Sequence, residues 1–242
     1  MHTHAIKAAA LALAILAAPG AARAAEVTLL ISNAVITVME DLAPRFEQAT
    51  GHKLAITFGS TNPLKARIEK GEAFDLTLLG EAAINDLVKQ GKVDAATRAV
   101  IARSGLGVAV RKGVARPDVG TTEAFKRTLL DAKSIAYLQD GLTGTYLKVL
   151  LERLGIADSM RPKHKSARGE AELGVTQISE VLHEKGAELA GPLPPEIQNY
   201  TNFAAAVGAN ARQPDAARAL LKYFASPDAA RVMKANGLEP AG

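Results

Sequence analysis

The stretch 58-FGSTNPLKARIEKG-71 joins a predicted strand to a predicted helix. The run 53-KLAITF-58 is short and apolar, as expected of a buried strand, and Leu64 and Ile68 are spaced as on one face of a helix. Residues 59–62 between them form a corner of glycine, serine, threonine and asparagine. Such residues cap helices, but the N–H groups at a helix start also bind anions, so this corner by itself leaves both interpretations open.

The first 24 residues have the pattern of a secretory signal peptide. Lys7 precedes the apolar run 8-AAALALAILAA-18, and 22-ARA-24 has alanine at both positions expected before a cleavage site. Because this run is shorter than the roughly 20 residues of a membrane span, we expect cleavage after Ala24 rather than a membrane anchor. No cysteine is available for lipidation. We therefore predict a soluble protein of the periplasm.

Composition narrows the class of protein further. The chain has 242 residues and contains neither Cys nor Trp, so burial must stabilise it without disulfides. Its formal net charge is only +4, and aromatic residues make up 4% of the sequence. A nucleic-acid-binding surface needs a strong basic excess or stacking aromatic residues, so we expect no nucleic-acid partner.

Short apolar segments alternate with amphipathic ones along the rest of the chain. We predict strands at 26–32, 53–58, 74–79, 106–110, 134–138, 172–176 and 203–207. We predict helices at 35–49, 63–71, 82–90, 121–130, 144–154, 177–185, 214–224 and 227–236, the last of which starts with the capping sequence 226-SPD-228. The proline-rich 191-GPLPPEIQ-198 is predicted to be a surface connection. This alternation indicates an α/β fold with parallel sheets covered on both faces, in one doubly wound domain or in two lobes.

Four predicted strands end in small polar residues that lead into a helix. These corners are 32-SNAV-35, 59-GSTN-62, 139-QDGLTGTY-146 and 176-TQIS-179. Ligands of open α/β sheets bind at the carboxyl ends of the strands. If the corners converge, their N–H groups and hydroxyls form an anion site, so taken together they favour ligand binding over simple capping.

Motifs for catalysis or metal binding are scarce. The sequence has no cysteine nucleophile, no H-E-x-x-H motif, no G-x-S-x-G motif and no phosphate-binding loop. We therefore predict no catalytic residues, no metal site and no cofactor. Glu180 and Asp140 lie near the predicted cleft and are candidate general bases, although a helix-surface acid and a turn aspartate explain them as well. Lys165 and Arg168 form a basic loop that we expect to be solvated.

The order of these segments resembles the periplasmic molybdate-binding proteins, which are solute receptors of ABC importers. The resemblance covers most of the chain after residue 24, through 39-MEDLAPRFEQATG-51, 58-FGSTNPLKARIEKG-71, 74-FDLTLL-79, 141-GLTGTYLKVLLERLG-155, 170-EAELGVTQISEV-181 and 220-LLKYFASPDAARVMKANGL-238. It implies the type II periplasmic binding fold, with two α/β lobes, a mixed five-stranded sheet in each, two crossing strands near 104–110 and 201–207, and the ligand cleft between the lobes. The implied first lobe comprises residues 25–105 and 205–242, and the second lobe comprises residues 106–204.

The resemblance also implies a ligand-binding set on both walls of that cleft. The implied residues are Ser32, Asn33, Ala34, Ser60, Thr61, Asn62, Leu142, Thr143, Gly144, Thr145, Thr176, Gln177 and Tyr200. Two hydroxyl groups of the family's site are missing. Ala34 stands where the family has a serine, and Phe203 stands where it has a tyrosine. Tyr200 lies close by and would supply that tyrosine if the alignment shifted slightly. These losses favour a different or larger anion than molybdate.

The implied function is capture of a small anion for an ABC importer permease by a monomeric receptor. Molybdate or tungstate and a small organic acid stay open as ligands. The segment 177-QISE-180 also resembles a branch of the superfamily that includes organic-acid binders and a periplasmic aconitate isomerase. Such an isomerase needs one acid–base group, for which the candidates are Glu180, Asp140, Tyr200 and Lys65.

Overall fold

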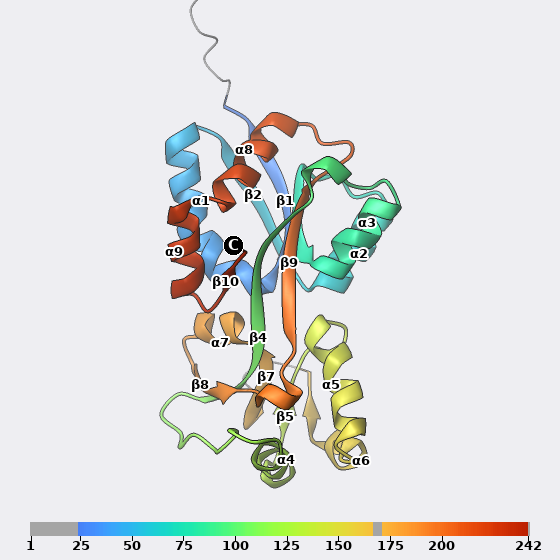
Figure 1. Ribbon diagram of the computed structural model, residues 1–242, viewed down its shortest axis with the longest axis vertical. Coiled ribbons are helices and arrows are strands. Elements are labelled where there is room, and N and C mark those ends of the chain that lie inside the picture. Colours follow the sequence, from blue (N-terminus) through green and yellow to red (C-terminus); the bar gives the residue numbers. More distant parts are fainter. Residues whose placement is uncertain (1–23, 167–170, 242) are drawn as a thin grey trace, which may run out of the picture.

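The computed structural model describes residues 24–166 and 171–241. The predicted signal peptide, except Ala24, and Arg168 of the basic loop therefore lie outside the described residues. The described chain forms two α/β lobes stacked along the long axis (Figure 1), as the predicted fold class requires. Within the described ranges, no helix has both the length and the apolarity that crossing a membrane requires.

The sheet of the first lobe is mixed. Its strand order is β2-β1-β3-β9-β4-β10, in which β1 runs parallel to β2 and β3, whereas β9 runs antiparallel to β3 and β4. The strands are β1 (Glu26–Ser32), β2 (Lys53–Gly59), β3 (Leu76–Gly80), β9 (Tyr200–Val207), β10 (Glu239–Pro240) and the first half of β4 (Ala99–Arg111). The two-residue β10 adds a sixth strand to the five that the family resemblance implies.

Helices cover both faces of this sheet because side chains alternate along its strands. Leu29 and Ile31 pack in one apolar cluster with α1 (Ile36–Thr50), α8 (Pro214–Phe224) and α9 (Pro227–Ala235). Leu30 packs in another with α2 (Thr61–Glu69) and α3 (Glu81–Lys89) on the opposite face (Figure 1). The carboxyl ends of β1, β2 and β3 lie next to the second lobe, where Ser32 and Ser60 share a cavity with Leu142 and Gly80 approaches the same leucine.

The second lobe has its own sheet and core. The second half of β4 lies between β8 (Ala187–Pro192) and β7 (Leu173–Gln177), which continues to β5 (Ile135–Ala136) and β6 (His164–Lys165). Its core joins Val108, Phe125 and Leu147, among others. The helical segments are α4 (Thr122–Asp131), α5 (Leu142–Arg153), α6 (Ala157–Met160), α7 (Ile178–His183) and the 3-10 turns η3 (Arg161–Lys163) and η4 (Pro195–Ile197).

Strand β4 connects the two lobes. Gly105 pairs with Tyr200 of the first-lobe sheet, and the next residue, Leu106, pairs with Gln177 of the second-lobe sheet. The return crossing lies beside it, where the Gln198 side chain bonds both the N–H and the carbonyl of Leu106, at 2.8 and 3.0 Å. The hydrogen-bonded path is thus continuous through β4 although the cores are separate. The lobe boundaries at 105/106 and 204/205 stay a prediction.

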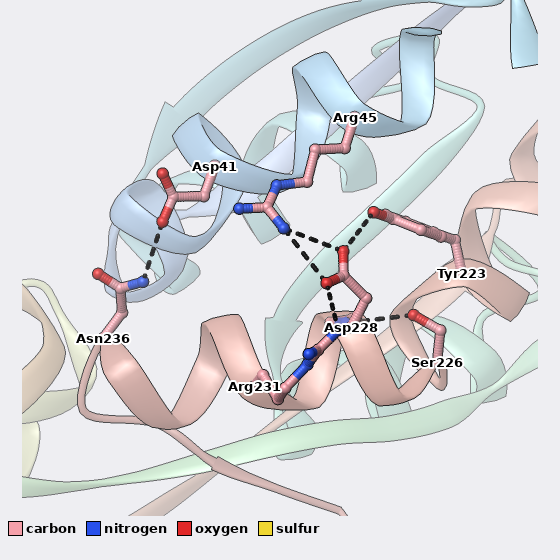
Figure 2. A network of polar contacts seen from close by, with 8 residues as sticks. Asp41, Arg45, Tyr223, Ser226, Asp228, Arg231 and Asn236 are labelled. Carbon is pink, nitrogen blue, oxygen red and sulfur yellow. Dashed lines mark hydrogen bonds and ion pairs between the residues drawn. The ribbon is translucent and has the colours of Figure 1, made fainter. Parts of the chain in front are cut away.

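Helices α1 and α9 of the first lobe are joined by a polar network (Figure 2). Arg45 reaches both carboxylate oxygens of Asp228 at 3.2 Å, and the Tyr223 hydroxyl donates to the same carboxylate at 3.2 Å. The predicted start of α9 is confirmed, because Ser226 Oγ accepts a hydrogen bond from Ala229 N at 3.1 Å. Burial is the largest single influence on the pKa of Asp228 and raises it, but the hydrogen bonds from Arg45 and Tyr223 and the charges of Arg45 and Arg231 together hold the pKa below its ordinary value.

Several predicted elements need correction. The strand predicted at 106–110 extends over Ala99–Arg111, and β8 was not predicted. Arg103 and Ser104 broke the apolar pattern of β4, while Gly191 and Pro192 made β8 look like a turn. In the described residues β8 pairs only with β4, and proline is tolerated on such an edge strand. The predicted connection at 191–198 is therefore partly strand and partly the turn η4.

Candidate functional site

The four polar corners meet at one small cavity between the lobes. Its volume is about 30 Å³. The first lobe contributes the ends of β1 and β2, and the second contributes the start of α5 and the junction of β7 with α7. The lining residues are Ser32, Ala34, Ser60, Thr61, Leu138, Gly141, Leu142, Thr143, Thr176, Gln177, Glu180 and Phe203. The predicted convergence of the corners is therefore present in the structure.

At the first corner, the chain leaves β1 through the 3-10 turn η1 (Asn33–Val35). Ser32 is buried and its Oγ accepts a long hydrogen bond of 3.4 Å from Ala34 N. Its hydroxyl proton is therefore not committed by this bond. Asn33 is half-buried and does not line the cavity.

At the second corner, the polar side chains do not cap α2. Ser60 occupies the N-cap position but accepts no hydrogen bond from the helix. Thr61 is buried and its Oγ1 accepts from Gly80 N at 3.2 Å. Asn62 points to the other lobe, where its Nδ2 donates to the Asp140 carbonyl at 2.9 Å. The first N–H groups of a helix have no partner within it, so those of α2 are available to a ligand.

At the third corner, Gly141 is the N-cap of α5 and again provides no side-chain cap. Leu142 and the buried Thr143 line the cavity. Gly144 does not line it: a Cβ at this position would collide with the Leu138 carbonyl oxygen, so the glycine allows α5 to pack on the preceding loop. Thr145 is exposed, and its hydroxyl donates to the Gly141 carbonyl at 3.0 Å.

At the fourth corner, an amide group and a carboxyl group line the cavity. Gln177 is 4% exposed, and its Nε2 donates to Thr201 Oγ1 at 3.0 Å. The Thr176 hydroxyl donates to the carboxylate of Glu180, one turn along the chain. Our ligand-binding set omitted Glu180, because from sequence a helix-surface acid explained it equally well. The signal that could have found it is its place in the first turn of a helix that begins at a predicted corner.

Tyr200 does not replace the missing tyrosine. It is 51% exposed, does not line the cavity, and its ring lies 4.8 Å from the Arg103 guanidinium carbon. Phe203 lies in the cavity wall instead and is 1% exposed. Together with Ala34, it leaves two apolar positions where the resemblance implied hydroxyls.

The cavity wall combines the positive ends of two helices with the carboxyl group of Glu180. Among the described residues, the lining contains no lysine, arginine or histidine, and the uncapped N-terminal ends of α2 and α5 supply positive partial charge. Within the described part of the chain, no three His, Cys, Asp or Glu side chains gather as metal ligands would. The wall therefore offers donors for an anion, a carboxyl group and an amide, without a built metal site.

Comparison with known proteins agrees with this geometry. Residues 27–239 match the family described as bacterial extracellular solute-binding protein. The chain is 35% identical to an aconitate isomerase from Pseudomonas sp. over 88% of this chain and 87% of that protein. It is 29% identical to the molybdate-binding protein ModA of Azotobacter vinelandii over 90% and 91% of the two chains.

The solved structures agree as well. The periplasmic molybdate-binding protein of Azotobacter vinelandii superposes with a TM-score of 0.76 at 20% identity, covering 89% of this chain and 100% of the other. This likeness shows the type II periplasmic binding fold. The chain therefore belongs to the family of bacterial extracellular solute-binding proteins, within which it is related to the periplasmic molybdate-binding proteins.

Proposed function

We propose that this protein binds a small organic-acid anion between its lobes, which move apart to admit it because the cavity of about 30 Å³ is smaller than such an acid. The observation that carries the proposal is the composition of the cavity wall. Hydroxyls of Ser32, Thr61 and Thr143 and the starts of α2 and α5 supply hydrogen-bond donors, and no cationic side chain lines the cavity among the described residues. Preorganised donors of this kind hold a carboxylate or an oxyanion at low desolvation cost.

The same wall favours an organic acid over molybdate or tungstate. A tetrahedral oxyanion is charged on all sides and needs donors all around it. Here Ala34 and Phe203 are apolar, and Glu180 adds a carboxyl group to the wall. An organic acid suits this mixed wall because its charge is confined to its carboxylates and the rest of the molecule is largely carbon.

We further propose that the protein acts in the periplasm as the receptor of an ABC importer. Its family is extracellular, which supports export, and the predicted cleavage after Ala24 fits this location. The permease partner, the monomeric state and the division into lobes at 25–105, 106–204 and 205–242 belong to this proposal. An importer operon beside the gene would support the permease.

Calorimetry tests the ligand class directly. We expect malate, citrate or trans-aconitate to bind with saturation, and each ligand that binds should also raise the melting temperature, because it stabilises only the folded form. Molybdate, tungstate and sulfate are the comparison set. Binding of micromolar molybdate without binding of any of the three acids would refute the organic-acid proposal.

A second candidate function is isomerisation of aconitate. It is favoured by the 35% identical aconitate isomerase and by the position of Glu180. Of the four acid–base candidates from the sequence, only Glu180 lines the cavity. Lys65 instead binds Glu69 at 2.8 Å, and this hydrogen bond is the largest cause that raises its pKa, so it stays protonated.

The reaction needs one group that removes a proton and returns it. Glu180 would take a proton from the CH2 group next to a carboxylate of trans-aconitate, and the electrons of that C–H bond would form the new double bond. The proton would return to the carbon at the far end of the old double bond, which balances the step without a cofactor. The donors at α2 and α5 would stabilise the delocalised anion.

Proton NMR of purified protein with trans-aconitate separates the two functions. Formation of cis-aconitate that is lost in Glu180→Gln, while trans-aconitate still binds, would support the isomerase. Glu152→Gln, an exposed acid on α5, is the matched control. Saturable binding of trans-aconitate with no conversion over hours would leave only the receptor function.

A further inference from the structure

The proposed anion site contains an acidic side chain, that of Glu180. This residue lines the small cavity between the lobes and belongs to the first turn of α7. The hydroxyl of Thr176, which lines the same cavity, donates a hydrogen bond to the Glu180 carboxylate. A glutamate in water is ionised at neutral pH. A negative group therefore stands in the wall that is proposed to receive another one.

The bound anion and Glu180 share one side of the cavity. Thr143 and the start of α5, which supply donors, belong to the second lobe, and so does Glu180. Movement of the lobes to admit the acid therefore does not separate the donors from the carboxylate. The cavity of about 30 Å³ has room for a few water molecules at most, so an anion that occupies it lies close to its lining groups.

A proton on Glu180 changes its effect on the anion. Two carboxylates within about 4–6 Å of each other repel, and this disfavours the state in which both are ionised. Protonation removes the repulsion. The neutral carboxyl group keeps an oxygen that accepts from Thr176, and it gains an O–H group that donates to the anion.

We propose that binding of the organic-acid anion is coupled to the uptake of a proton by Glu180. The form of the site with a neutral carboxyl group binds the anion, and the ionised form repels it. Affinity therefore falls as the pH rises, because binding requires a proton that becomes scarcer. This inference rests on the proposed binding of an organic acid. It belongs to the receptor function, because a protonated carboxyl group cannot remove a proton from aconitate.

Other charged groups surround α7, which packs against α1, β4 and β8. In the described part of the chain none of them lines the cavity. They are His183 and Glu184 at the end of α7, Glu40, Asp41, Arg45 and Glu47 on α1, Arg103 and Arg111 on β4, and Glu188 on β8. His183 titrates near neutral pH in its own contact with Glu40, so the test has to separate it from Glu180.

Calorimetry counts the proton directly. Whichever of malate, citrate and trans-aconitate binds is titrated into the protein at pH 7 in PIPES and in Tris, two buffers with different heats of ionisation. We expect wild type to take up more than about half a proton per anion bound, and Glu180→Gln to take up none beyond that of the acid itself. Glu152→Gln, an exposed acid on α5, is the control and should match wild type.

The affinity itself should show the same coupling. From pH 6 to pH 8 the wild-type affinity should fall about tenfold or more. The affinity of Glu180→Gln should change less than about threefold over this range, because its amide resembles the neutral carboxyl group. Ionisation of the acid affects both proteins equally, so it cancels in the comparison.

The outcomes separate the inference from the function on which it rests. Equal proton counts in wild type and Glu180→Gln would overturn the inference and leave organic-acid binding intact. If Glu180→Gln fails to fold, His183→Asn decides: uptake that persists in this variant supports Glu180, and uptake that disappears assigns the proton to His183 and overturns the inference. If none of the three acids binds wild type at pH 6 or at pH 8, the proposed function itself fails.

Discussion

The polar side chains of the second corner do not cap the helix that follows them. Ser60 occupies the capping position without bonding the helix, Thr61 supports Gly80, and Asn62 reaches Asp140 in the other lobe. By contrast, Thr121 and Ser226 both cap the helices they precede, α4 and α9, away from the cavity. The ligand-binding interpretation of this corner stays a prediction, because α8, which contributes nothing to the cavity, also starts without a side-chain cap.

Thr61 provides a test of that interpretation. Its Oγ1 accepts a hydrogen bond from Gly80 N, so the hydroxyl proton can point to a bound anion. We expect Thr61→Val to weaken anion binding about fivefold, the value of one buried hydrogen bond. Thr61→Ser keeps the hydroxyl and is the control. Calorimetry giving the same affinity for Thr61→Val as for wild type would exclude this hydroxyl from the site.

Gly80 tests how closely the lobes approach each other. A Cβ at this position would lie 2.5 Å from Leu142 Cδ1 of the second lobe. We expect Gly80→Ala to weaken ligand binding about tenfold, because the extra methyl group crowds the contact between the lobes. Leu142→Ala in the same chain should restore part of the affinity. Gly186→Ala, where a Cβ meets nothing within 4 Å, is the control.

At the scale of elements, helix α3 is tied to the sheet by its first residue. The Glu81 carboxylate accepts a hydrogen bond from Asn202 of β9 at 2.9 Å and forms an ion pair with Arg98. The bond from Asn202 is the largest cause that lowers the pKa of Glu81; burial opposes it, and Arg98 adds to the lowering. This element therefore contributes stability that depends on pH.

The sign of that dependence follows from the lowered pKa. A carboxyl group whose pKa is lower in the folded state stabilises the fold above its unfolded pKa of about 4.3, and this contribution is lost as pH falls through the folded pKa. Glu81→Gln should therefore reduce the free energy of unfolding at pH 7 by up to about 1 kcal/mol. In urea titrations the difference from wild type should shrink below about pH 4. A difference that stays constant with pH would contradict this account.

At the scale of the whole molecule, direct contacts join the two lobes around the cavity. Asn62 binds the Asp140 carbonyl, and His183 of α7 lies 3.6 Å from the carboxylate of Glu40 on α1. Both contacts connect lobes that have separate cores and share only the crossing segments. Direct protein contacts therefore hold the two lobes together near the cavity.

Removal of the Asn62 contact should shift the lobes apart. We expect Asn62→Ala to enlarge the radius of gyration in X-ray scattering without ligand, and added ligand to reverse the change. Ligand affinity should fall about threefold to tenfold, since closure then loses one hydrogen bond. Asn85→Ala, which removes a partner of Arg98 within the first lobe, is the control. Identical scattering curves for Asn62→Ala and wild type would show that this bond does not hold the lobes.

The order of elements was predictable because it depends on local patterns. Apolar runs, helical spacing and helix-start residues such as Ser226 act within a few positions, and the resulting strands and helices lie close to those expected. Where the pattern was interrupted, as at Arg103 in β4 or Pro192 in β8, the strand depended on pairing with distant segments. Those elements could not be predicted from their own residues.

The sequence by itself determined the alternating α/β fold and the four polar strand ends. The spacing of apolar residues and the residue types preferred at turns both depend on neighbouring positions in the chain. Only the tertiary structure decided which side chains reach the cavity. Tyr200 and Phe203 lie three residues apart on β9 and so point to opposite faces, one to solvent and one to the cavity. Likewise, Asn62 bonds the other lobe and does not line the cavity, whereas Glu180 does line it. The physical reason is that the direction of a side chain depends on register and on how the lobes dock, and both are set by contacts between residues far apart in the chain.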